Sequence, residues 1–182
     1  MKKCALVGIG NIMFCDDGLG VYAAEFIRRN FIIPPKVDVY DGGTLGFGMM
    51  TLFQEYETIV ILSTTSEGES GDLFHFTKEE LLSQGSVRQS ANEVEVAQML
   101  EICSILEDNE MGQVEIVAMH PGDIIPVETN LTPVVRKAFM PMIDKTLEVL
   151  RLHQIDLQPR KNSISLDAII ADYAHPRQQV NR

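Results

Sequence analysis

The sequence predicts a three-layer α/β sandwich, in which a mainly parallel sheet of about five strands carries helices on both faces. Three short apolar runs, 3–9, 58–64 and 114–120, are typical of strands that are buried inside a parallel sheet. Two further runs, 36–40 and 73–77, supply the remaining strands. Segments with helical character alternate with these runs, and this alternation favours parallel strands joined by helices.

Four segments are expected to be helical. The first covers about 18–30, and a second, weakened by glycine, covers 45–56. In 94–107, apolar residues recur at offsets 0, 3, 4, 7 and 10 from Val96, which is the spacing of a helix with one apolar face. The last long helix starts at about Thr132, because a threonine followed by proline is a typical N-cap and first helical residue.

Length and composition indicate one domain and restrict its partners. Residues 1–155 are expected to form a single α/β domain, and the polar segment 156–182 is expected to be a flexible C-terminal tail. The net charge of −11 disfavours binding to nucleic acids and to anionic membranes. Three widely spaced cysteines do not suggest a disulfide framework. Without a signal peptide or an apolar run of membrane length, we expect a cytoplasmic protein that does not insert into membranes.

A functional site is expected where the parallel strands end. In open α/β sheets, ligands bind outside the carboxyl ends of the strands. Here these ends correspond to 10–17, 41–44, 63–66 and 120–123.

The turn GIGNIMFCDDGLG, residues 8–20, admits three interpretations. It begins like a dinucleotide-binding turn, with Asp41 as a candidate ribose ligand, but Met13 replaces the third glycine, and Asp16 and Asp17 would repel a pyrophosphate. The two aspartates could instead cap the first helix, whose dipole favours carboxylates at its N-terminus. In the third interpretation, one carboxylate is a ligand for a divalent metal ion, and Gly18 and Gly20 let the backbone come close around it.

The same turn resembles the G-x-G-N-x-L-x-x-D-[DE]-G-x-G signature of the hydrogenase maturation peptidases. DGGTLG at 41–46 resembles the second signature of that family, and LTPVV at 131–135 resembles the start of its final long helix. The similarity extends from about residue 3 to residue 152. It implies a five-stranded twisted sheet between helices, with one strand antiparallel. It also implies removal of a C-terminal extension from the large subunit of a nickel–iron hydrogenase, after nickel has been inserted into that subunit.

The resemblance further implies that three ligands of the peptidase recognise the nickel carried by the substrate. The acid of the first signature corresponds to Asp17. The other two positions, an aspartate and a histidine in the family, correspond to Ser63 and Asn92, which do not ionise. His120 is a candidate substitute ligand because it ends a predicted strand. Cys15 could supply a thiolate, but a small half-buried apolar residue is the favoured interpretation.

The sequence does not assign a catalytic residue. Ser63 could be a nucleophile if His120 were within hydrogen-bonding distance as a base, although no G-x-S-x-G motif accompanies it. The remaining histidines, His75, His153 and His175, are expected to point outward from the surface.

Two functions are therefore expected from different classes. The first is nickel-dependent endoproteolytic maturation of the hydrogenase large-subunit precursor, with retention of proteolysis in question because of Ser63 and Asn92. The alternative is a non-cleaving relative that binds the precursor as a chaperone or adaptor. A nucleotide-binding domain, suggested by the glycine turn alone, is a third and weaker interpretation.

Overall fold

The structure is a computed structural model, and it describes residues 2–44, 51–83, 96–102 and 112–175. A five-stranded sheet with the order β3-β1-β4-β6-β5 forms its centre. Its strands are β1 (Lys2–Ile9), β3 (Val37–Gly43), β4 (Tyr56–Thr64), β5 (Leu73–Thr77) and β6 (Gln113–Met119). Neighbouring strands are parallel except for β5, which pairs antiparallel with β6 at one edge. The mainly parallel sheet and its single antiparallel strand confirm the predicted fold class.

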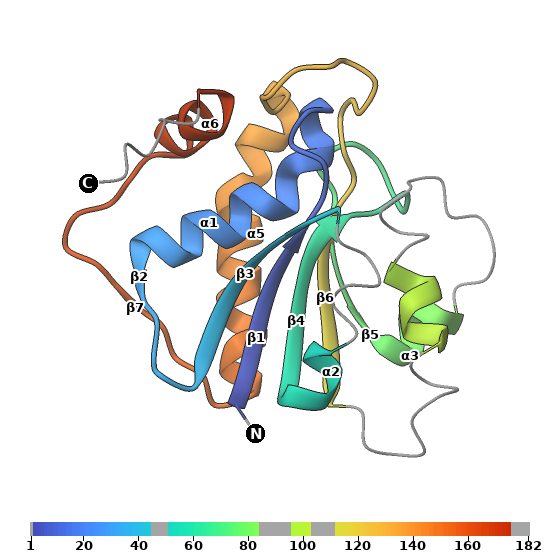
Figure 1. Ribbon diagram of the computed structural model, residues 1–182. Coiled ribbons are helices and arrows are strands. Elements are labelled where there is room, and N and C mark those ends of the chain that lie inside the picture. Colours follow the sequence, from blue (N-terminus) through green and yellow to red (C-terminus); the bar gives the residue numbers. More distant parts are fainter. Residues whose placement is uncertain (1, 45–50, 84–95, 103–111, 176–182) are drawn as a thin grey trace.

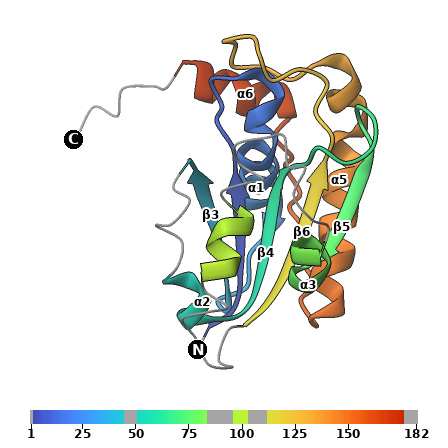
Figure 2. The same ribbon diagram turned by 90° about the vertical axis from the view of Figure 1, so that its right-hand side faces the viewer.

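Helices cover both faces of this sheet (Figures 1 and 2). On one face, α1 (Leu19–Asn30) and α5 (Pro133–Leu152) pack against β1, β4 and β6, and their shared core includes Leu6, Leu62 and Phe139. On the other face, short helices α2 (Leu52–Glu55) and α3 (Lys78–Ser83) cover a second apolar core. The sheet is therefore buried on both sides, which explains the continuous apolar runs of its central strands.

Two of the predicted helices are only partly described. Residues 96–102 are helical, and Val96, Met99 and Leu100 are buried in the second core, as the apolar spacing predicts. The end of that prediction, 103–107, lies outside the described residues. The segment 45–50 lies outside them too, so the predicted helix 45–56 is represented by α2 alone.

The expectation of a flexible tail after residue 155 is wrong for the described part of that segment. Strand β7 (Gln158–Pro159) pairs with β2 (Phe31–Ile32), and α6 (Leu166–Ala174) packs against α1. Ile169 and Ile170 of α6 are buried in the core. The sequence signal is short, because α6 has only nine residues, and Leu166 and Tyr173 add partly buried contacts to those of the isoleucine pair. Residues 176–182 lie outside the described part of the chain.

No helix in the described ranges combines the length and the apolar character that a membrane span requires.

Candidate functional site

The site predicted from the sequence lies at the carboxyl edge of the sheet, at the top in Figure 1. Strand β4 is central there, because it pairs with β1 through Leu62 and Gly8, and with β6 through Thr64 and Met119. The segments that follow β1, β4 and β6 therefore leave the sheet side by side. We call this edge the rim.

Glycine is required at two positions, one in the turn after β1 and one in the first turn of α1. Gly10 has a φ of 147°, and a Cβ atom on it would lie 1.9 Å from the backbone oxygen of Asp17. A Cβ atom on Gly20 would lie 2.1 Å from the backbone oxygen of Leu62, so this glycine lets α1 approach β4 closely. The glycines therefore serve backbone packing around an acidic turn.

Asp17 lies on the rim within a short 3₁₀ helix, η1 (Cys15–Gly18), that contacts β4. Its side chain is half-buried, and its Oδ2 accepts a hydrogen bond of 3.1 Å from the backbone N–H of Asn11. The glycine turn thus presents a partly solvated carboxylate, a group of the kind that binds hard cations, next to the end of β4.

The adjacent acid, Asp16, has a different role. It is completely buried and accepts hydrogen bonds from the backbone N–H groups of Gly122, Asp123 and Thr132, and from the Thr132 hydroxyl, at 2.7 to 3.0 Å. The N-cap residues of η1 and α1 make no side-chain cap hydrogen bond, and the bonds of Asp16 go to another loop, so the helix-capping interpretation is wrong for Asp16. Asp16 instead connects the glycine turn to the loop 120–132 that leads into α5.

The end of β4 contributes buried hydroxyl groups in place of a carboxylate. Ser63 is 3 % exposed, and its Oγ has no hydrogen-bond partner among the described residues, as is also true of Thr64 Oγ1. Both line a small, mostly apolar cavity together with Phe76 and Leu81. Asn92, the third predicted position, lies outside the described residues.

His120 follows β6 on the same rim. Its Nδ1 lies 2.9 Å from the backbone oxygen of Glu67, and the ring borders an open groove of about 280 Å³ that includes Thr65 and Ile125. No bond between His120 and Ser63 is present, so the pair lacks the hydrogen bond of a nucleophile and its base.

The described residues contain no group of three or more His, Cys, Asp or Glu side chains placed to hold a metal ion. Cys15 does not extend the set, because burial, and then the nearby charge of Asp16, raise the pKa of its thiol. A thiolate ligand is therefore disfavoured there. Asp17 remains the predicted metal contact, and a contribution of His120 stays a prediction.

Sequence reasoning missed two clusters away from Asp17. His75 and His153 were expected to point into solvent, but both bond Glu115, with Nε2 to oxygen distances of 2.7 and 2.9 Å. Glu115 lies in the first half of β6, toward the edge of the sheet opposite the rim. Their association depends on the β5–β6 pairing and on α5 packing, which no local sequence pattern reports.

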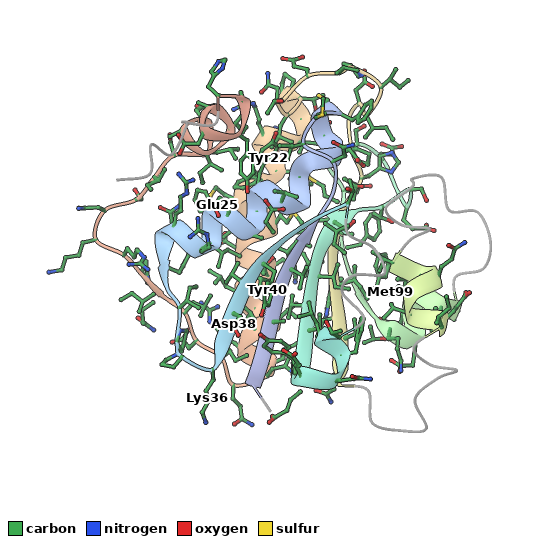
Figure 3. The ribbon with its side chains drawn as sticks, in the orientation of Figure 1. Tyr22, Glu25, Lys36, Asp38, Tyr40 and Met99 are labelled. Carbon is green, nitrogen blue, oxygen red and sulfur yellow. The ribbon has the colours of Figure 1, made fainter. Side chains whose placement is uncertain are left out.

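The second cluster surrounds a cavity of about 510 Å³ between α1, β3 and α6. Figure 3 shows Glu25 on α1 and, on the neighbouring β3, Tyr40. Burial raises the pKa of Glu25, but hydrogen bonds from Arg28 and Arg29 together lower it by more. The pKa of this carboxyl group is therefore below its ordinary value. At the mouth of the cavity, Asp41 Oδ2 accepts a hydrogen bond of 2.9 Å from the hydroxyl of Tyr173. The acid proposed as a ribose ligand is thus bonded to α6.

Fold and rim together define an α/β protein with an acidic glycine turn at the carboxyl edge of a mainly parallel sheet. The family model described as hydrogenase maturation protease matches residues 21–149. The chain belongs to the hydrogenase maturation protease family.

Individual relatives agree with this assignment. The chain is 25% identical over 151 residues to the hydrogenase expression/formation protein HupD of Bradyrhizobium diazoefficiens, covering 82% of this chain and 78% of the relative. It is 23% identical over 161 residues to the hydrogenase 2 maturation protease of Escherichia coli, covering 87% and 97%.

Solved structures share the fold. The maturating endopeptidase HybD of E. coli superimposes with a TM-score of 0.77 at 23% identity, over 88% of this chain and 99% of that one. The maturation protease HybD of Thermococcus kodakarensis superimposes with a TM-score of 0.67 at 18% identity, over 81% and 98%.

Proposed function

We propose that this protein matures a nickel–iron hydrogenase by cleaving the C-terminal extension from the large-subunit precursor in the cytoplasm. One observation carries the proposal: in a member of this family, the glycine turn holds the Asp17 carboxylate on the rim, beside the end of β4. A carboxylate that is half-buried but not enclosed can still exchange water for a ligand brought by another molecule.

In this proposal the nickel belongs to the precursor, and Asp17 is the contact that detects it. A weak site on the peptidase suits that role, because the ion is already held by the substrate and needs only one added ligand. Ser63 is a neutral oxygen at the end of β4, so it adds little affinity for a divalent ion. The formal net charge of −11 favours approach of a positively charged metal centre.

Incubation with the nickel-loaded precursor tests the proposal, with mass spectrometry to detect loss of the extension. Cleavage is expected with the native chain and is expected to fall at least tenfold in Asp17→Asn. Glu69→Gln is the matched control, since Glu69 is an exposed acid on the loop between β4 and β5. Cleavage that is unchanged in Asp17→Asn would remove Asp17 from the proposal.

The second candidate is a precursor-binding chaperone or adaptor that does not cleave. It is favoured by Ser63, which stands where the family resemblance places an acid, and by the lack of a three-ligand group among the residues that the structure describes. Stable co-elution with the precursor and no loss of mass would support it. The combined change Ser63→Asp and Asn92→His is expected to raise divalent-metal affinity in either case, and an unchanged affinity would show that these positions do not face the metal.

A further inference from the structure

Exposed apolar side chains are concentrated beside Asp17. In the described part of the chain, eight large hydrophobic residues are exposed, and five of them come from three segments that meet at the rim. These five form what we call the rim patch: Met13, Phe14, Ile125, Val127 and Val134. Ile125 and Val127 are 83 % and 72 % exposed, which is unusual for side chains whose burial is favourable.

Backbone contacts join two of the three segments that form the rim patch. Phe14 pairs with Glu128 in a β-bridge, and the N–H of Cys15 donates to the backbone oxygen of Glu128 at 2.8 Å. The glycine turn and the loop 120–132 therefore lie against each other, at the top of the sheet in Figures 1 and 2. Asp17 lies three residues after Phe14, and therefore close to this contact between the two segments.

Asp16 holds the two segments in a fixed arrangement. Its buried carboxylate accepts hydrogen bonds from Gly122, Asp123 and Thr132, so the loop that carries Ile125 and Val127 is fixed at both ends. A surface that is already ordered loses little conformational entropy when it binds a partner. This order is consistent with a docking surface.

The charges around the rim patch indicate the chemistry of the partner. Asp17, Asp123 and Glu128 are all acidic. At the start of α5, Arg136 is directed to Asp167 in an ion pair, and the exposed Lys137 is the cation next to Val134, so acids still outnumber it at the patch. The groove of about 280 Å³ that includes Ile125 also opens here. A complementary partner has an apolar surface around a positively charged centre.

We infer that the rim patch docks the apolar surface of the large-subunit precursor that surrounds its nickel ion. This inference rests on the proposed function and extends it from the metal contact to the protein contact. Apolar burial provides affinity and orientation, while Asp17 contacts the metal, so the patch acts on precursor binding rather than on the cleavage step.

A double variant, Ile125→Ser with Val127→Ser, tests the inference. Both side chains are highly exposed, so the melting temperature is expected to stay within a few degrees of the native value. The KM for the nickel-loaded precursor is expected to rise at least tenfold with kcat changed less than twofold. The matched control is Ile32→Ser with Leu152→Ser, two exposed apolar residues on β2 and at the end of α5, and its KM is expected to be unchanged. A KM within twofold of the native value in the rim variant would overturn the inference.

Photocrosslinking separates this inference from the proposed function. A photoreactive residue is placed at position 127 or, as a control, at position 152, and the nickel-loaded precursor is added. A crosslink at 127 and none at 152 supports the rim patch, whether or not the precursor is cleaved. Crosslinking at 152 alone, or at neither position, overturns the rim patch, whereas absence of cleavage with a crosslink at 127 counts only against the peptidase proposal.

Discussion

Replacing Asp16 by asparagine is expected to destabilise the protein by about 2–4 kcal/mol. The carboxylate is completely buried, with Oδ2 accepting bonds from Gly122, Asp123 and the Thr132 hydroxyl, and Oδ1 accepting one from the Thr132 N–H. An amide keeps one acceptor oxygen but turns an NH₂ group toward at least one of these donors. The variant therefore loses at least one bond and leaves a buried donor unpaired, at about 1–3 kcal/mol. Loss of the negative charge weakens the remaining bonds.

Urea denaturation followed by circular dichroism measures this effect as a lower midpoint at an unchanged slope. Asp17→Asn is the neighbouring control, and it is expected to cost less than about 1.5 kcal/mol because this side chain is half-buried. If Asp16→Asn costs less than about 1 kcal/mol, or no more than Asp17→Asn, then Asp16 does not hold the two loops together as described.

Three further predictions concern other positions. Gly10→Ala is expected to destabilise the fold by about 2–4 kcal/mol, because the added Cβ would lie 1.9 Å from the backbone oxygen of Asp17. A cost below about 1 kcal/mol in a urea titration would contradict that packing. Glu25→Gln is expected to cost about 2 kcal/mol at neutral pH. Because the folded pKa of Glu25 is lowered, its stabilisation is present above the unfolded pKa, about 4.3, and is lost as pH falls from there through the folded value. The difference from the native chain should therefore shrink as the pH falls below the unfolded pKa, and a difference independent of pH would refute the ion pairs. In the folded protein, Cys15 is expected to react with iodoacetamide at pH 8 at least tenfold more slowly than in urea-unfolded protein, because burial raises the pKa of its thiol. Peptide mass mapping measures both rates, and equal rates would refute the burial of Cys15.

The sheet could be predicted from the sequence because burial on both faces leaves a local signal. Strand β4 is apolar and β-branched along most of its length, and the alternation of such runs with helical spacing implies a parallel sheet. Helix α6 was not predicted, because Ile169 and Ile170 are buried in a core that is formed by elements far away in the chain, α1 among them.

The site could be predicted only in part, for the same reason. The glycine turn and the strand ends located the rim, but the sequence could not assign different roles to the two adjacent aspartates. The partners of Asp16 lie 106 to 116 residues away, in the loop before α5 and at its N-cap. Likewise, Glu115 meets His75 and His153 across separations of 40 and 38 residues, so their pairing depends on tertiary packing.

The proposed function of this protein is to process a hydrogenase precursor in response to nickel. The most direct measurement is the mass of the large-subunit precursor after incubation with the protein, compared between nickel-loaded and metal-free precursor. Loss of the C-terminal extension is expected from the nickel-loaded form only. An unchanged mass of the nickel-loaded precursor, or equal cleavage of the metal-free form, would contradict it.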